Sequence, residues 1–466
     1  MLLQYFYDDK LAQASYLVGC QAKGEAVVVD PARNIEAYLS TAEKEGLKIV
    51  GALETHIHAD YVSGAREIAD RVGATLYVSD EGDANWKYEN LDSFSYKLLK
   101  DGDTITLGNL TFKVMHTPGH TPESISFLLT DGGANADEPI GIFTGDFVFV
   151  GDVGRPDLLE KAAGVQGTSE PGARDMFHSL ERFKQLPDFL QVWPAHGAGS
   201  ACGKSLGAVP SSTVGYEKRF NWALQHENET DFIKALLEGQ PEPPVYFAIM
   251  KHVNKVGPAI LRDLEKPEVI TDGNQIETLL NDGAQVLDTR EAGAFSQQHI
   301  PGTINIPFNP SFTNWAGWLI NYDEPLYLLC DPNQTDDILT ALRSIGIDLV
   351  RGFMDAEQAI KQAKNLESYA NISPQEAKQL LKTEAVTFID VRNQSEWDEG
   401  HIEGAKHIML GTLKNRLDEV PNNGTILLTC QSGGRSAIGA SLLQAKGYKQ
   451  IQNITGGYTA WTEQDS

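Results

Sequence analysis

Short apolar runs alternate with polar, helix-like segments along the first half of the chain. The run Ala26–Val29 is short, bounded by a turn and rich in β-branched residues, which predicts a buried strand. Similar runs predict further strands at Ile49–Leu53, Thr75–Val78, Leu110–Met115, Ile125–Leu129 and Ile142–Phe149. Residues Ile35–Glu45 and Asp231–Leu237 have helical spacing instead. The proline cluster Gln240–Pro244 then predicts a domain edge near residue 245.

The second half of the chain repeats itself. Three segments recur about 100 residues further on, a period that indicates tandem domains and not a solenoid. The matching pairs are Val286–Arg290 with Phe388–Arg392, His299–Thr303 with His401–Ala405, and Leu326–Cys330 with Ile426–Cys430. Each copy alternates strand and helix, which predicts an α/β domain with a parallel sheet covered on both faces. We therefore expect domains at residues 1–245, 260–362 and 368–466.

Composition narrows the class of protein. A length of 466 residues with 41% hydrophobic and 22% charged residues is typical of about three globular domains. A net charge of −26 argues against a nucleic-acid or anionic-membrane partner. No basic leader and no membrane-length apolar run stands in the sequence, and Cys20, Cys202, Cys330 and Cys430 lie far apart. These features predict a cytoplasmic protein with individual thiols, and we expect a homo-oligomer.

Potential metal ligands follow several of the predicted strands. His56, His58 and Asp60 come just after Ile49–Leu53, where their side chains can converge on a pocket. Three further polar groups follow other apolar strands, namely His120, Asp146 and His196. One such residue is more often a capping or core residue, but several at strand ends indicate a metal site at one sheet edge.

These residues resemble a known family. The pattern His-x-His-x-Asp from His56, followed by Gly-His-Thr-Pro, Gly-Asp and Ala-His segments, resembles the metallo-β-lactamase fold, an αββα sandwich. The dinuclear zinc hydrolases of that fold have a histidine after the motif aspartate, whereas this chain has Tyr61. Because a neutral phenol is a poor ligand for a divalent metal, we expect a single metal ion.

Within this fold the chain is similar to the persulfide dioxygenases. The resemblance implies that His56, His120 and Asp146 hold one Fe(II) per chain as a facial triad. Three ligands on one face would leave adjacent positions open for a persulfide and O₂, which redox-inert zinc could not activate. The resemblance further implies that three other residues orient the ligands and a bound water, namely His58, Asp60 and His196.

Two segments after the metal residues are candidates for substrate contacts. Gly154–Asp157 resembles a Gly-Arg-x-Asp segment of the same family, in which Arg155 would bind a substrate carboxylate or sulfite and Asp157 would hold its guanidinium. An ordinary surface ion pair is the alternative. Cys202 lies in the glycine-rich segment Gly199–Gly207 and could receive sulfur at the pocket mouth, although a buried, inert cysteine fits equally well.

The second repeat carries a candidate nucleophile. Cys430 ends an apolar strand, and the loop through Arg435 leads into a helical segment, so backbone N–H groups and a helix end favour a thiolate there. This six-residue loop resembles that of rhodaneses, sulfurtransferases that carry a persulfide on the cysteine, and is shorter than that of related phosphatases. Its remaining members would cradle the substrate anion, namely Gln431, Ser432, Gly433 and Gly434.

The first repeat departs from that pattern. It keeps Cys330 but has Thr335 where Arg435 stands, lacks the loop glycines and gains Asp331 and Asp336. Acidic neighbours raise the pKa of a thiol and repel a sulfur anion. We expect this copy to be inactive and retained for structure or docking.

Together the segments resemble a persulfide dioxygenase–rhodanese fusion. The resemblance implies oxidation of a low-molecular-weight thiol persulfide by O₂ to sulfite and thiol, coupled to sulfur transfer that can form thiosulfate, in sulfide detoxification or sulfur metabolism. One alternative is a zinc thioester hydrolase of the glyoxalase II type joined to a sulfurtransferase. Another is a non-catalytic sulfur-relay scaffold in which the metal only stabilises the fold.

Overall fold

The computed structural model describes residues 1–163, 166–383 and 385–463. It divides the chain into two compact units. The first comprises Met1–Leu264 with Arg343–Gly346, and the second comprises Glu265–Leu342 with Ile347–Ser466. None of the helices in these described ranges has the length and apolar character that a membrane-spanning segment needs.

The first unit contains two six-stranded sheets, in the orders β1-β2-β3-β4-β5-β6 and β12-β11-β10-β9-β8-β7. The strands are β1 Leu2–Asp8, β2 Gln13–Cys20, β3 Glu25–Val29, β4 Lys48–Leu53, β5 Thr75–Ser79, β6 Tyr96–Leu99, β7 Thr104–Leu107, β8 Leu110–His116, β9 Ile125–Asp131, β10 Gly141–Gly145, β11 Gln191–Pro194 and β12 Ser212–Thr213. The helices are α1 Glu36–Lys44, α2 Ala65–Val72, α3 Leu158–Ala163, α4 Ser169–Phe183, α5 Val214–Phe220, α6 Glu229–Leu237 and α7 Phe247–Val256.

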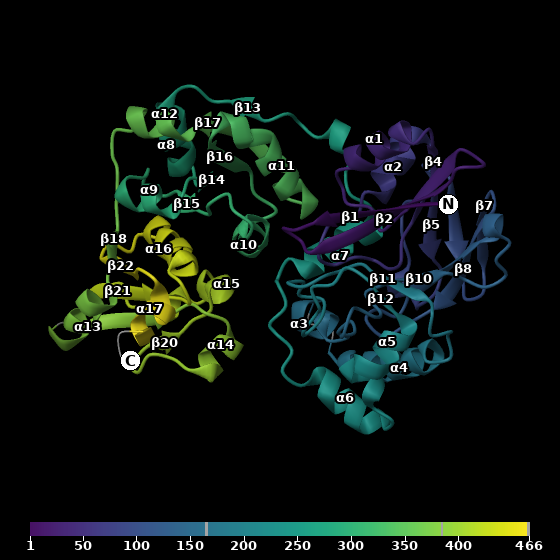
Figure 1. The fold of residues 1–466 in the computed structure, drawn as a ribbon. Helices are drawn as coiled ribbons and strands as arrows, with labels where there is room; N and C mark the ends of the chain where they lie inside the picture. The colour runs from purple at the N-terminus through teal and green to yellow at the C-terminus, as the bar shows by residue number, and fades with distance from the viewer. Residues whose placement is uncertain (164–165, 384, 464–466) are drawn as a thin grey trace. The chain divides into compact units, whose positions relative to one another are not determined.

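Three apolar cores show how these layers pack. One core joins the facing sides of the two sheets, with Tyr16 and Val27 from the first sheet against Phe127 and Phe143 from the second. A second core joins the outer side of the first sheet to α1 and α2, and a third joins the second sheet to α4 and α6. Figure 1 shows these helices on the outer sides of the sheets. The predicted αββα sandwich is confirmed.

One predicted strand is too long. The apolar run Ile142–Phe149 predicts a single strand, but β10 ends at Gly145. Phe147 and Val148 are buried in the third core from the loop that follows. Apolar character therefore indicated burial at these positions and not strand structure.

The second unit contains two five-stranded parallel sheets, in the orders β13-β17-β16-β14-β15 and β18-β22-β21-β19-β20. The first copy comprises β13 Glu268–Val269, α8 Gly273–Asn281, β14 Gln285–Asp288, α9 Ala292–Gln297, β15 Ile304–Asn305, α10 Phe312–Leu319, β16 Leu326–Cys330, α11 Thr335–Ser344, β17 Val350–Asp355 and α12 Ala356–Gln362. The second comprises β18 Ala370–Ile372, α13 Pro374–Thr383, β19 Val386–Asp390, α14 Gln394–Glu399, β20 Lys406–His407, α15 Leu410–Leu413, β21 Thr425–Thr429, α16 Gly434–Ala445, β22 Ile451–Ile454 and α17 Gly457–Glu463. The two sheets have the same strand order, so the predicted repeat and its parallel α/β fold are confirmed.

Candidate functional site

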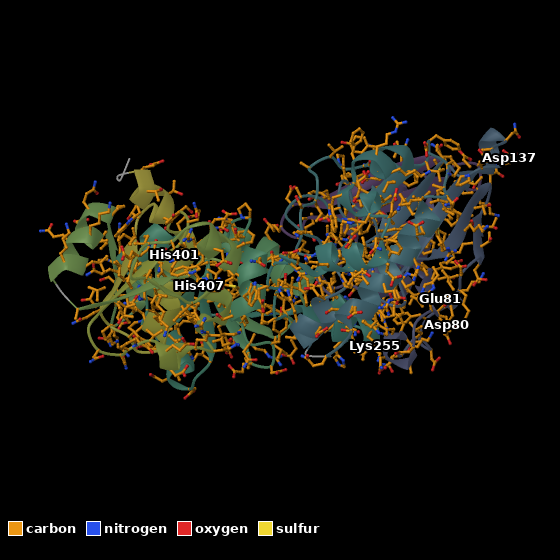
Figure 2. All side chains as sticks on the ribbon, turned by 90° about the horizontal axis from the view of Figure 1, so that it is seen from below. Asp80, Glu81, Asp137, Lys255, His401 and His407 are labelled. Carbon is orange, nitrogen blue, oxygen red and sulfur yellow. The ribbon has the colours of Figure 1, made fainter. Side chains whose placement is uncertain are left out.

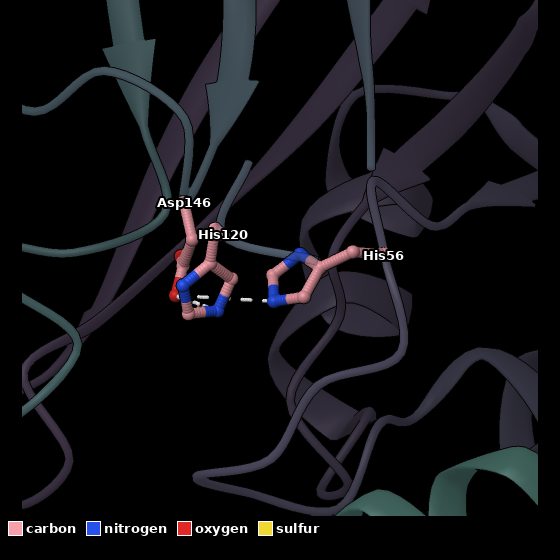
Figure 3. Close-up of side chains that lie close together, drawn as sticks. All are labelled: His56, His120 and Asp146. Carbon is pink, nitrogen blue, oxygen red and sulfur yellow. Dashed lines mark ion pairs between the residues drawn. The ribbon is translucent and has the colours of Figure 1, made fainter. Parts of the chain in front are cut away.

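Three strand ends bring two histidines and one aspartate together in the first unit. His56 follows β4, His120 follows β8 and Asp146 follows β10. The Nε2 atoms of His120 and His56 lie 3.4 and 3.8 Å from Oδ2 of Asp146, and Figure 3 shows the two rings and the carboxylate facing one another. One ligand atom from each residue lies within 4.8 Å of the others.

The donor set fits a metal ion. Nε2 of His56 and both carboxylate oxygens of Asp146 are buried without a hydrogen-bond partner among the described residues. Burial lowers the pKa of His56 and of His120, so both imidazoles are neutral and present a lone pair. Ligands about 2.1 Å from one metal ion lie about 3.0–3.4 Å apart, depending on the angle between them, and the two measured separations of 3.4 and 3.8 Å are slightly longer.

Hydrogen bonds to the outer ring nitrogens orient both histidines. Oγ1 of Thr55 lies 3.0 Å from Nδ1 of His56 and donates to Oδ2 of Asp30 over 2.8 Å. Nδ1 of His120 lies 3.0 Å from the carbonyl oxygen of Arg155. Such contacts fix the tautomer and the ring plane of a metal-binding histidine.

The other members of the His-x-His-x-Asp motif point to different partners. Nε2 of His58 lies 3.0 Å from Glu54 and 3.2 Å from Asp30. Burial disfavours charge on His58, but these two carboxylates outweigh it and raise the pKa of His58 well above its usual value. His58 therefore belongs to a buried ionic cluster next to His56.

Asp60 contacts His196 and not the carboxylates that surround His58. Its Oδ2 lies 3.1 Å from Nε2 of His196, which is itself 3.4 Å from Oδ1 of Asp146. Asp60, His196 and Cys202 also place one ligand atom each within 4.8 Å of one another. Burial, together with the nearby carboxylates of Asp146 and Asp60, raises the pKa of the Cys202 thiol, so Cys202 is protonated in this arrangement.

Tyr61 is buried beside this motif. Its hydroxyl donates to the carbonyl oxygen of Asp30 over 3.3 Å. Burial and the carboxylates of Asp30 and Glu54 raise its pKa well above the usual value, which keeps the phenol neutral. Tyr61 therefore donates a hydrogen bond from the position that follows the motif aspartate.

Arg155 and Asp157 form a bidentate pair with both N···O distances at 2.7 Å. Both side chains are buried, with the Arg155 side chain 0% exposed, so this is not an ordinary surface ion pair. The backbone N–H of Arg155 also donates to the carbonyl oxygen of Cys202 over 3.1 Å. This backbone hydrogen bond connects the loop after β10 to the Cys202 segment.

In the second unit, the Cys430 loop lies between β21 and α16. Sγ of Cys430 accepts the backbone N–H of Gly433 over 3.1 Å and the hydroxyl of Ser436 over 3.4 Å. Gly433 has φ +98°, a left-handed conformation that favours glycine, and this conformation aims its N–H at the sulfur. Arg435 is held by both oxygens of Glu396, each at 2.6 Å.

The repeated Asp-x-Arg and His-Ile segments support this loop. Arg392 is paired with Asp390 and donates to Oε1 of Gln431 over 3.3 Å. The rings of His401 and His407, labelled in Figure 2, stack on Trp397 at centroid distances of 3.7 and 5.0 Å. Nε2 of His407 lies 2.7 Å from the carbonyl oxygen of Arg392. Arg392 therefore connects the Asp-x-Arg segment to the Cys430 loop through Gln431, and His407 contacts the backbone of Arg392.

The equivalent cysteine of the first copy is held differently. Sγ of Cys330 lies 3.5 Å from Oγ1 of Thr335. The carboxylate of Asp331 accepts the backbone N–H of Asn333, and Pro332 has no N–H to offer. The pKa of Cys330 is raised as expected, although burial is a larger cause than the carboxylates of Asp331 and Asp355.

Sequence reasoning missed Asp30, Thr55, Glu54 and Glu396. Asp30 stood directly after an apolar run, the same signal that identified Asp146, and it adopts an unusual φ of +49°. Thr55 and Glu54 lie inside the quoted motif, but the sequence did not show which neighbours they would meet. Glu396 precedes Arg435 by many residues, and nothing in its local pattern indicated the pair.

Comparisons with known proteins agree with this architecture. The metallo-beta-lactamase superfamily profile matches residues 8–196, and the rhodanese-like domain profile matches residues 273–358 and 373–464. A crystal structure of a metallo-beta-lactamase from Staphylococcus aureus subsp. aureus COL is 46% identical with a TM-score of 0.69 and covers 76% of this chain and 98% of its own.

Two curated relatives match the first unit. A mitochondrial persulfide dioxygenase from Bos taurus is 28% identical over 241 residues, which is 51% of this chain and 80% of the relative. A hydroxyacylglutathione hydrolase from Gloeobacter violaceus is 34% identical over 177 residues, which is 38% of this chain and 60% of the relative. The chain therefore belongs to the metallo-β-lactamase superfamily and joins a domain of that fold to two rhodanese-like domains.

Proposed function

We propose that the first unit oxidises a low-molecular-weight thiol persulfide and that Cys430 transfers sulfane sulfur. The first reaction is RSSH + O₂ + H₂O → RSH + SO₃²⁻ + 2H⁺, in which the outer sulfur is oxidised and O₂ is reduced. In the second, a nucleophile attacks the outer sulfur of the Cys430 persulfide, the S–S bond breaks and the Cys430 thiolate leaves. With sulfite as nucleophile the product is thiosulfate.

The observation that carries the proposal is the buried set of two neutral histidines and one carboxylate. His56, His120 and Asp146 would hold one Fe(II), because two histidines with one carboxylate and open positions are typical of non-heme iron oxygenases. Bound iron would supply the redox chemistry that lets O₂ react with a persulfide. The 28% identical persulfide dioxygenase supports this assignment.

Tyr61 supports a single metal. Its hydroxyl donates to the Asp30 carbonyl and its pKa is raised, so the phenol stays neutral, and a neutral phenol is a poor ligand for a divalent metal. The side chains around the triad have separate tasks. Thr55 and the Arg155 carbonyl hold the histidine rings, and the Asp60–His196 pair holds a proton beside Oδ1 of Asp146.

Metal analysis and oxygen uptake test the first reaction. We expect about one iron per chain, with glutathione persulfide driving oxygen uptake and sulfite formation. His120→Ala should lose both the iron and the uptake. His178→Ala is the matched control, because His178 is 63% exposed and lies apart from the triad. Two zincs per chain without oxygen uptake would contradict the proposal.

A zinc thioester hydrolase is the second candidate. Asp60, His196 and Cys202 could form a second metal site beside the triad, and the hydroxyacylglutathione hydrolase relative is 34% identical over its matched part. Thiol release from an acyl-thiol under nitrogen, with zinc bound, would favour this function. The absence of such release together with oxygen-dependent sulfite formation would exclude it.

A further inference from the structure

The peptide bond between His56 and Ile57 is held at both of its polar groups by side chains. The carbonyl oxygen of His56 accepts the hydroxyl of Tyr88 over 2.7 Å, and the N–H of Ile57 donates to Oε1 of Glu123 over 2.8 Å. Because β4 ends at Leu53, this peptide lies outside the strand ladder, and side chains satisfy its polar groups. The backbone that carries the first histidine of the metal triad is therefore fixed from two directions.

Glu123 comes from the loop that also carries His120. It lies three residues after His120, in the connection between β8 and β9. The carbonyl oxygen of Glu123 accepts the hydroxyl of Ser79, at the end of β5, over 2.6 Å. Two residues further on, the backbone N–H of Ile125 donates to the carbonyl oxygen of Thr55 over 2.8 Å. The Glu123 side chain and this backbone hydrogen bond therefore join the two loops that present the histidines.

The burial of Glu123 is costly. Glu123 is 0% exposed, and its Oε2 has no hydrogen-bond partner among the described residues. Burial raises the pKa of Glu123 to about 7, yet Oε1 remains an acceptor for the Ile57 N–H whether the carboxyl is charged or neutral. A buried group with an unpaired oxygen lowers stability, which points to a role for the oxygen that is paired.

We propose that Glu123 and Tyr88 are positioning residues of the metal centre, because together they hold the peptide that follows His56. The peptide unit is planar and rigid, so a displacement of this unit also moves the Cα atom of His56. Nε2 of His56 would then leave its place 3.8 Å from Oδ2 of Asp146, whereas binding constellations must be held within about 0.5 Å of their productive geometry. The inference rests on the proposed metal centre. Neither residue is a catalytic residue, since each acts through a backbone atom.

The test measures metal affinity on the full chain. Each variant is loaded with an equimolar amount of Co(II) and titrated with a chelator, and the visible absorption of bound Co(II) reports both the Kd and the ligand geometry. Glu123→Met, which removes the oxygen acceptor at similar size, should raise the Kd about 10- to 100-fold and change the spectrum. Tyr88→Phe removes a single hydroxyl and should raise the Kd at least about fivefold. Glu123→Gln keeps an oxygen acceptor and should restore the Kd to within about threefold of the unmodified chain, with an unchanged spectrum.

Glu67→Met is the matched control. Glu67 is 6% exposed and accepts the backbone N–H of Leu261 over 2.7 Å, so its loss also removes a buried acceptor from a backbone donor. This variant should lose stability in thermal unfolding and keep the Kd and the spectrum of the unmodified chain.

The outcomes separate this inference from the function on which it rests. A Kd within about twofold of the unmodified chain in Tyr88→Phe and in Glu123→Met would overturn the positioning role. Equal losses of affinity in Glu67→Met, or in Glu123→Gln and Glu123→Met, would overturn it as well. If Glu123→Met fails to fold, Tyr88→Phe decides the question. An unmodified chain that binds no Co(II) would overturn the metal centre and the inference together, whereas Co(II) binding without oxygen uptake by the iron-loaded chain on glutathione persulfide would overturn the proposed function alone.

Discussion

Gly433→Ala should disable sulfur transfer without unfolding the domain. Gly433 has φ +98°, and a Cβ there would lie 3.2 Å from the carbonyl oxygen of Ile454 and 3.3 Å from the backbone nitrogen of Gly456. Both neighbours are backbone atoms and cannot rotate away. The loop must therefore shift, and the shift moves the Gly433 N–H, whose nitrogen lies 3.1 Å from Sγ of Cys430.

Two free-energy costs are expected in Gly433→Ala, one on stability and one on sulfur transfer. The left-handed conformation costs an alanine about 1–2 kcal/mol, which lowers the free energy of unfolding. Loss of a hydrogen bond to a charged thiolate costs about 1.5–3 kcal/mol. Because the thiolate is both the attacking and the leaving group, kcat/KM for sulfur transfer should fall about 10- to 100-fold.

Gly447→Ala is the matched control for backbone strain. Gly447 follows the other end of α16 with φ +93°, and a Cβ at this position would meet no atom within 4 Å among the described residues. This variant should lose similar stability and keep its activity. The assay is sulfur transfer from thiosulfate to cyanide, with the rate of Cys430 alkylation by iodoacetamide followed against pH. Full activity in Gly433→Ala, or equal loss in Gly447→Ala, would refute the role assigned to the Gly433 N–H.

Three further predictions concern Glu123, Arg155 and Cys430. Burial raises the pKa of Glu123 to about 7 from 4.5, so the folded state binds a proton more tightly than the unfolded state and stability falls as pH rises from about 4.5 to 7. Urea unfolding should show a smaller decline over that range in Glu123→Gln, and an identical slope would contradict the assignment. Arg155→Met leaves the Asp157 carboxylate buried beside Lys161 alone and should destabilise the first unit by about 3–5 kcal/mol in thermal unfolding, whereas a loss below about 1 kcal/mol would show that the pair is dispensable. Cys430→Ser should abolish thiosulfate-to-cyanide sulfur transfer and leave oxygen uptake on glutathione persulfide intact, and equal loss of both would indicate obligatory coupling.

Local patterns were sufficient for the repeat and for most strands. The runs that predict β4, β8 and β21 are short, apolar and bounded by polar residues. Such a run is sufficient to indicate a buried strand. The loop after β10 was predicted wrongly because Phe147 and Val148 are buried without being part of a strand. A periodic pattern indicates which residues avoid water, and it does not indicate whether backbone groups pair with a neighbouring strand.

The sequence by itself determined which residues stand at strand ends, including His56, His120, Asp146 and Cys430. Only the tertiary structure decided their partners. His58 and Asp60 are two residues apart in one motif, yet the first meets Asp30 and the second meets His196. The physical reason is that a hydrogen bond or ion pair depends on atoms within about 3–4 Å, and residues far apart in sequence reach that distance only when sheets and helices pack.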